Sequence, residues 1–203
     1  MIPTIFVHLP LLLLPVLAQP PTGSCQFDVL TPQAIEERAV TRFNGAVEEY
    51  VRLHRRLART VAPDEMFDEE GWFASEALLR EAIIAARPGA RQGHFFTAGV
   101  SQVVRDRVDK ALLRRVHQPG DELFAPLARK GDDSIPAVNE PFPATLEATA
   151  WPMLVQNLPP LPRELDYAVW GRALVLVDVS ANLVIDVLPD ALPEGALTRS
   201  VYQ

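Results

Sequence analysis

The spacing of hydrophobic residues predicts a long amphipathic helix that begins just after residue 30. Thr31 is a favourable N-cap, Pro32 suits the first turn, and Pro63 marks the end. Apolar residues recur between them every three to four positions, which places them on one side of a helix. The expected stripe consists of Ile35, Ala39, Phe43, Val47, Tyr50, Val51, Leu57 and Val61. One side of this helix should therefore face a core.

Two further helices are expected, over about residues 71–87 and from Thr97 to about Val116. The second has a wide apolar face made of Trp72, Ala74, Leu78, Leu79, Ala82, Ile83 and Ala86. The third has a stripe made of Val100, Val104, Val108, Ala111, Leu112 and Val116. Phe95 and Phe96 are expected to pack onto the third helix, the alternative being an exposed apolar patch. Three helices of this length can form an antiparallel bundle.

Helical periodicity is lost over residues 118–163, where turn-forming residues alternate with isolated apolar ones. The chain has 19 prolines, and many of them lie here and near the termini. We expect an extended segment draped over the helices, with a short helical turn or strand within residues 146–154. A proline run before residue 163 then acts as a stiff spacer.

Residues 173–179 and 183–188 are rich in Val, Ile and Leu, which predicts a β-hairpin. A three-residue turn, Ser180-Ala181-Asn182, would pair Val179 with Leu183. One face would then be wholly apolar and would pack on the helices: Val175, Val177, Val179, Leu183, Ile185 and Val187. A third strand is expected from Tyr167, Val169 and Trp170, with Gly171 at the bend.

The other face of this hairpin carries two carboxylates, Asp178 and Asp186, as diagonal neighbours about 7–8 Å apart at the backbone. A two-residue turn would instead put them on opposite faces. The spacing suits a shared metal or an acid/base pair, but a half-exposed hairpin face supplies it equally. We expect the second alternative, with both carboxylates in contact with solvent.

These elements predict an α+β fold with one domain over residues 31–203. Its parts are the helices in 31–117, the irregular Pro-rich stretch 118–163, the hairpin region 164–190 and a tail 191–203. The 203 residues are 48% hydrophobic and 22% charged, which is ordinary for a globular domain.

The first 18 residues have the pattern of a secretory signal peptide. An apolar run ends in Val16-Leu17-Ala18, so cleavage is expected between Ala18 and Gln19. The run is too short and too rich in proline to cross a bilayer as a helix, so no membrane span is expected in the mature chain. A buried N-terminal strand is the alternative. The expected location is periplasmic or secreted, with residues 19–30 as a flexible linker.

Cys25 is the single cysteine, so an internal disulfide cannot form. Its surroundings, Thr22-Gly23-Ser24-Cys25, also admit lipoprotein anchoring, although a lipoprotein site has Leu where Thr22 stands. A free or intermolecular thiol near the N-terminus is the preferred interpretation.

The net charge of -7 argues against a nucleic-acid partner. One basic patch, His54, Arg55 and Arg56 with Arg59, could bind an anion or a cell-envelope polymer. A solvated helix end, where cations suit the helix dipole, explains it as well.

Established catalytic motifs are missing from the sequence. It has no Gly-rich phosphate loop, no G-x-S-x-G elbow, and no HExxH or CxxC pattern. A metal site could still combine Asp178, Asp186 and His94, or gather His54, His94 and His117 around a carboxylate. No cofactor is predicted, and a divalent metal belongs to this alternative alone.

Residues 158–188, with a Pro-rich lead, an aromatic-containing strand, Gly171 and a Leu/Val-rich hairpin, resemble the C-terminal part of RcnB-like periplasmic proteins of nickel and cobalt homeostasis. That family tends to have Gly in the turn where this chain has Asn182, and it supplies no metal ligands to carry over. The whole chain, including NGAVEEYVRLHRRL and ARQGHFFTAGV, also resembles exported bacterial proteins of unknown function. The resemblance implies an exported location.

The sequence therefore predicts an exported, non-enzymatic protein that binds or scaffolds an envelope protein or polymer. The alternative is a periplasmic metal-handling or hydrolytic protein that uses Asp178 and Asp186 with histidines. The oligomeric state cannot be read from the residues.

Overall fold

A computed structural model describes residues 31–61, 69–115, 135–143 and 152–193. The expectations for the signal peptide, the Ala18–Gln19 cleavage, Cys25 and His117 lie outside the described residues.

The described chain has an α+β fold, as the sequence predicts. Its helices are α1 (Pro32–Val61), α2 (Glu69–Ala86), α3 (Ala98–Arg115) and the short α4 (Pro152–Val155). Its strands are β1 (Leu165–Trp170), β2 (Ala173–Asp178) and β3 (Leu183–Leu188). Residues 152–155 thus take the helical alternative, and the third strand is confirmed as β1.

Helix α1 begins as expected, because the Thr31 hydroxyl accepts a hydrogen bond from the backbone N–H of Ala34 at 3.2 Å. The middle of its apolar stripe is buried, including Phe43 and Val47. Ile35, at the N-terminal end of the stripe, is instead 53% exposed. The helix therefore faces the core through its central turns.

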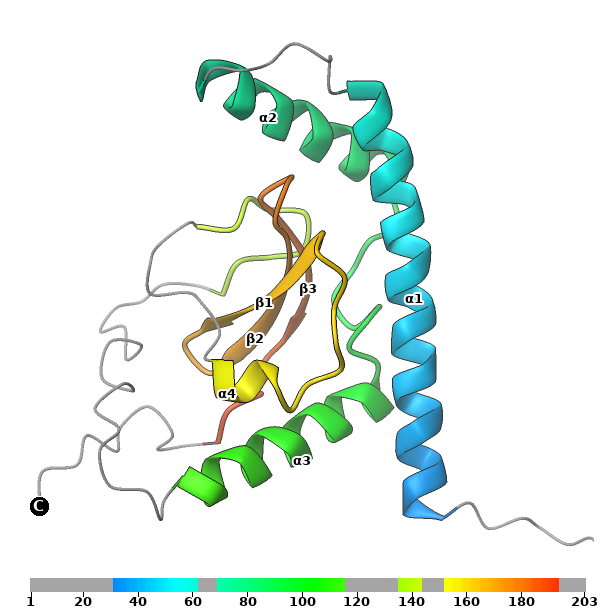
Figure 1. The fold of residues 1–203 in the computed structure, drawn as a ribbon, viewed down its shortest axis with the longest axis vertical. Helices are drawn as coiled ribbons and strands as arrows, with labels where there is room; N and C mark the ends of the chain where they lie inside the picture. The colour runs from blue at the N-terminus through cyan, green and yellow to red at the C-terminus, as the bar shows by residue number, and fades with distance from the viewer. Residues whose placement is uncertain (1–30, 62–68, 116–134, 144–151, 194–203) are drawn as a thin grey trace, which may run out of the picture.

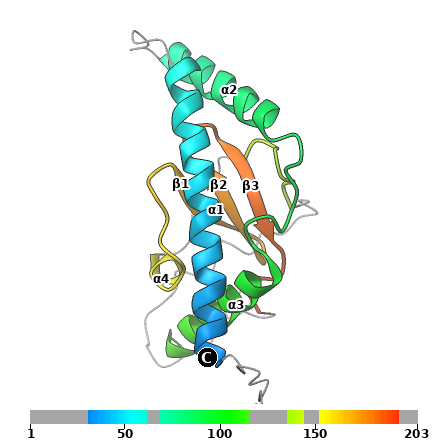
Figure 2. The same cartoon turned by 90° about the vertical axis from the view of Figure 1, so that its right-hand side faces the viewer.

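The three long helices do not form the antiparallel bundle that their lengths suggest. Helices α2 and α3 both contact α1, at its opposite ends, and the sheet occupies the space between them (Figure 1). Turned by a quarter, the molecule shows α1 crossing in front of the sheet (Figure 2). The bundle expectation is wrong because the apolar sheet competes for the helix faces that would otherwise pack on one another.

The strands form an antiparallel sheet in the order β1-β2-β3. Gly171 turns the chain between β1 and β2 at a φ of 55°, a conformation that suits glycine. Between β2 and β3 the predicted three-residue turn is wrong: Asp178 pairs with Leu183, which leaves a four-residue loop. The register then shifts, because Leu176 pairs with Asp186 while Val177 pairs with Val184. Ile185 is the extra residue of this β-bulge.

The bulge changes which side chains face the helices. The main core on the helix side contains Leu174, Leu176, Leu183, Ile185 and Leu188. A second cluster on the far face contains Val175, Val177, Val184 and Val187. The expectation of one apolar face toward the helices is therefore wrong, and Val179, which was placed on it, is 54% exposed. Every residue of β2 and β3 is buried, so the sheet is covered on both sides.

Of the stretch 118–163, the structure describes residues 135–143 and 152–163. The second part packs on the core beside α3, whereas residues 135–143 lie along the edge of β3 and not over the helices. Backbone hydrogen bonds join Asn139 N–H to the carbonyl of Val184, and Val184 N–H to the carbonyl of Glu140. Phe142 reaches the far face of the sheet, where its ring meets Trp170 at 5.9 Å between centroids. The unpaired edge of β3 attracts this segment, because backbone groups there need partners.

We expect Leu176→Ala to lower the free energy of unfolding by about 3 kcal/mol, because it leaves a cavity in the core between sheet and helices. Val179→Ala, in the same hairpin, should cost within about 0.5 kcal/mol because the side chain is largely exposed. Urea unfolding of both variants measures the difference. Similar losses in the two would contradict the observed register.

Candidate functional site

A polar cluster lies buried where α1 crosses the sheet, and Asp178 is at its centre. The Tyr50 hydroxyl donates to Asp178 Oδ2 at 2.6 Å, and His54 Nδ1 lies 2.6 Å from the same oxygen. The backbone N–H of Ala181 donates to Oδ1 at 2.9 Å. Because Tyr50 and His54 are four residues apart, one face of α1 presents both of them to the sheet.

The second carboxylate, Asp186, is wrapped by the loop between α2 and α3. Its Oδ1 accepts from the N–H of Gly93 at 2.8 Å, and its Oδ2 accepts from Phe95 and Phe96 at 2.7 and 2.8 Å. Its own neighbour Val187 donates to Oδ1 at 2.8 Å. Consecutive backbone amides make a concave anion site of this kind, and here a side chain of the same chain fills it. Gly93 adopts a φ of 82°, which allows the loop to turn around the carboxylate.

Both carboxylates are thus fully buried, at 0% exposure, and the expectation that they contact solvent is wrong. They do share one face of the hairpin, but that face is the one covered by α1 and the loop 93–96. A buried carboxylate is costly unless donors surround it. Here both are surrounded by donors, most of which come from distant parts of the sequence, α1 and the loop 93–96.

Arg87 is the cation of the cluster. Its guanidinium carbon lies 5.1 Å from the centroid of the Tyr50 ring and 5.8 Å from that of Phe95. Nη1 and Nη2 are buried, and neither has a hydrogen-bond partner among the described residues. Burial lowers the pKa of Arg87, while the nearby charges of Asp186 and Asp178 act in the opposite direction. The guanidinium stays charged, since arginine does not lose its proton in proteins.

Tyr50 is held as a proton donor in this setting. Burial, and next the negative charge of Asp178, raise the pKa of its hydroxyl far above the ordinary value. Its ring also meets Phe95 edge-on, with centroids 6.0 Å apart. Tyr50, a residue of α1, therefore contacts both the hairpin and the loop.

An ion pair fixes the same part of α1 to the start of β1. Arg55 Nε donates to Glu164 Oε1 at 2.7 Å, and Glu164 is buried. The hydrogen bond from Arg55 is the main reason that the pKa of Glu164 lies below its ordinary value. Together with Tyr50 and His54, this pair links α1 to the hairpin and to the start of β1 through residues within two turns of the helix.

The residues of the predicted basic patch separate. His54 is buried against Asp178, so its expected place at a solvated helix end is wrong. Arg55 is paired with Glu164, whereas Arg56 and Arg59 are exposed on the other side of α1.

The residues of the speculative metal site separate as well. His94 is exposed and its ring stacks edge-on against Phe95, while the backbone on either side of it binds Asp186. In the part of the chain that the structure describes, no group of three or more His, Cys, Asp and Glu side chains is arranged to hold a metal ion.

Sequence reasoning missed Tyr50, Arg87 and the amides of residues 93–96 as members of the cluster. One signal was available: His54 follows Tyr50 by one helical turn, on the apolar stripe of α1, where a polar residue implies a buried partner. From the sequence, Arg87 was expected only to mark the end of the helix over residues 71–87. Backbone amides have no sequence signal at all.

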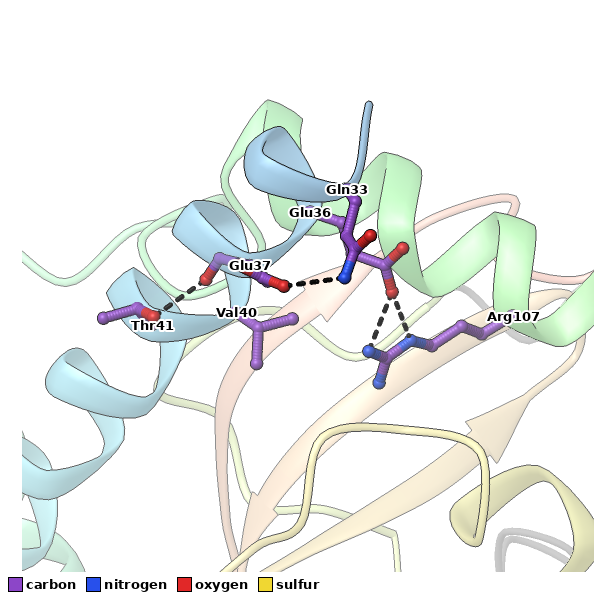
Figure 3. Close-up of a pocket in the computed structure, with 6 residues that line it drawn as sticks. All are labelled: Gln33, Glu36, Glu37, Val40, Thr41 and Arg107. Carbon is purple, nitrogen blue, oxygen red and sulfur yellow. Dashed lines mark hydrogen bonds and ion pairs between the residues drawn. The ribbon is translucent and has the colours of Figure 1, made fainter. Parts of the chain in front are cut away.

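A separate surface hollow of about 400 Å³ lies where α1 meets α3 (Figure 3). Its lining residues are Gln33, Glu36, Glu37, Val40, Thr41 and Arg107. Arg107 donates through Nε and Nη2 to Glu36 Oε1, at 3.1 and 2.9 Å, and Gln33 donates to Glu37 at 3.1 Å. These polar groups pair with one another, so the residues that line the hollow mainly fasten α3 to α1.

We expect Asp186→Asn to lower the free energy of unfolding by about 3 kcal/mol or more, because the new NH₂ group faces backbone N–H donors that lose their acceptor. Asp166→Asn, at the exposed position of β1, is the matched control and should change the free energy of unfolding by less than about 0.5 kcal/mol. Thermal or urea unfolding measures both. A small effect at Asp186 would show that the loop does not depend on the carboxylate.

The pair of Arg55 and Glu164 predicts an acid-dependent stability difference. Because the pKa of Glu164 is lowered in the folded state, its contribution is present above the ordinary glutamate pKa of about 4.3. The contribution is lost as the pH falls through the lowered folded value. Wild type should therefore exceed Glu164→Gln in stability near neutral pH, and the gap should close in acid. A gap that stays constant with pH would exclude the ion pair as its cause.

Within the described residues, no helix is both long and apolar enough to cross a membrane. The chain matches no protein-family model, and no curated protein or solved structure is significantly similar to it. Its function therefore has to be argued from its own residues.

Proposed function

We propose that the chain is an exported, non-enzymatic protein of the bacterial cell envelope that binds or scaffolds a partner through its surface. The observation that carries this proposal is that both buried carboxylates already accept hydrogen bonds from donors of the chain itself. Asp186 accepts four backbone N–H groups, and Asp178 accepts Tyr50, His54 and the N–H of Ala181.

A general base or metal ligand needs a lone pair directed at the incoming group. In this cluster the carboxylate oxygens are directed at a helix, a loop and a turn, which they hold together. The buried polar cluster thereby has a structural role. We therefore place partner binding on the surface of the protein.

The surface offers groups that folding does not use. On α2, Phe73 is 60% exposed and Leu78 is 47% exposed, although Leu78 was expected to face the core. On α1, Arg56 and Arg59 are exposed and pair with no described carboxylate. Exposed apolar and cationic side chains of this kind favour a binding role.

Location is supported by the sequence pattern of residues 1–18, with a cleavage motif at Ala18. The absence of paired cysteines agrees with a fold that is stabilised by its buried polar contacts and needs no disulfide.

One observation favours the second candidate, a metal-handling or hydrolytic protein. His54 Nδ1 meets a buried carboxylate at 2.6 Å, the contact that orients the imidazole in many acid–base sites. This arrangement would leave Nε2 of His54 as the reactive atom.

We expect the chain, expressed with its own N-terminus in a Gram-negative host, to reach the periplasm with Gln19 as its first residue. Mass spectrometry of the periplasmic fraction measures this. Ala18→Arg should block cleavage, because the peptidase reads a small residue there, while Gln19→Ser should be processed normally. Recovery of the intact chain from the cytosol would overturn the proposal of export.

Calorimetric titration with Ni²⁺ or Zn²⁺ separates the two candidate functions. We expect no stoichiometric binding that depends on His94, and the same heats for His94→Gln, which should fold normally because the side chain is exposed. The double variant Asp178→Asn, Asp186→Asn extends the test, with circular dichroism to check folding. One equivalent of bound metal that is lost in His94→Gln, or in a His54→Gln variant that still folds, would favour the metal-handling candidate.

A further inference from the structure

The side of α1 that faces away from the core carries a line of arginines. We name this set the arginine stripe, and its members are Arg38, Arg42, Arg52, Arg56 and Arg59. With 3.6 residues per turn, spacings of three, four and ten residues keep side chains on one side of a helix. All five are exposed, and the buried residues of α1 occupy the opposite side.

The stripe is not used by the described part of the fold. Arg55, Arg80 and Arg107 each pair with a glutamate. No member of the stripe forms an ion pair with another described residue. As far as the described residues are concerned, these five charges are therefore available for an anionic partner.

The shape of this surface favours a binding partner that is flat. Helix α1 has 30 residues and runs along one whole side of the described fold (Figure 1), and the view in Figure 2 faces that side. From Arg38 to Arg59 the stripe extends about 30 Å at 1.5 Å per residue. A convex ridge lets all its arginines reach a flat surface together, whereas an extended polymer is held better in a groove.

Two other sets of exposed side chains on α1 lie next to the arginine stripe. Glu48 and Glu49 are also exposed and divide it into an N-terminal pair and a C-terminal group of three arginines. Ile35 is exposed beside the N-terminal pair, where an apolar side chain can enter the headgroup region of a bilayer.

We propose that the arginine stripe docks α1 flat on the surface of an anionic phospholipid bilayer, with the guanidinium groups on lipid phosphates. This inference rests on the proposed envelope location and names the partner surface. Each arginine near an anionic bilayer raises affinity about fivefold. The net charge of -7 does not prevent this, because interactions beyond a Debye length of about 10 Å at 0.1 M salt are largely screened.

The test is co-sedimentation of the mature chain with vesicles of phosphatidylglycerol and phosphatidylcholine in equal parts, and with phosphatidylcholine alone. We expect binding to the anionic vesicles only, weakening as salt is added. Arg52→Gln, Arg56→Gln should weaken the binding about 25-fold, since two contacts worth about fivefold each are lost.

The matched control is Arg91→Gln, Arg163→Gln, which removes the same charge from exposed arginines outside α1. It should bind as wild type does, and both double variants should keep the wild-type melting temperature. Equal losses in the two would show a net-charge effect and overturn the proposal. Failure of the wild type to bind anionic vesicles would overturn it as well.

Soluble polyphosphate is the competing ligand. If it binds through Arg52 and Arg56 while vesicles do not, the stripe is a polymer site and the bilayer proposal is wrong. Neither result affects the proposed export. That proposal fails only if the intact chain, with residues 1–18 still attached, is found in the cytosol.

Discussion

The fold depends on how two carboxylates are kept inside the protein. A buried, unpaired carboxylate would cost several kcal/mol, so each must be surrounded by donors before the sheet can close against α1. Asp178 takes its donors from α1, and Asp186 takes its donors from the loop 93–96. The polar contacts thereby decide where the long helix crosses the sheet, while the apolar core supplies most of the driving force.

This arrangement also explains the shape of the helical half. The loop 93–96 has to reach Asp186 in β3, so α2 and α3 diverge from it toward opposite ends of α1 and do not pack on each other (Figure 1). Phe95 and Phe96, on the same loop, are buried in the core cluster that also holds residues of α1 and α3, so the alternative of an exposed apolar patch is wrong. One short loop thus carries both apolar anchors and the amides that hold the carboxylate.

The inner and outer sides of α1 have different roles. Its inner side is used up by the core and by the contacts of Tyr50 and His54. Its outer side carries arginines that form no ion pair with another described residue. The buried cluster thus holds the helix on the sheet, whereas the arginine stripe has no such role among the described residues.

The sequence by itself determined the local elements. Thr31 and Pro32 start α1, the Val/Leu-rich segments form strands, and Gly171 bends the chain between two of them. These features depend on neighbours a few residues apart, which periodicity and turn chemistry report directly. The tertiary structure alone decided which hairpin face meets the helices, because a single bulged residue, Ile185, changes the alternation. It also decided the partners of the two aspartates, since His54 lies 124 residues from Asp178 and the Phe95 amide lies 91 residues from Asp186. No local pattern encodes a hydrogen bond over that separation, and a backbone amide is the same in every residue that could supply it.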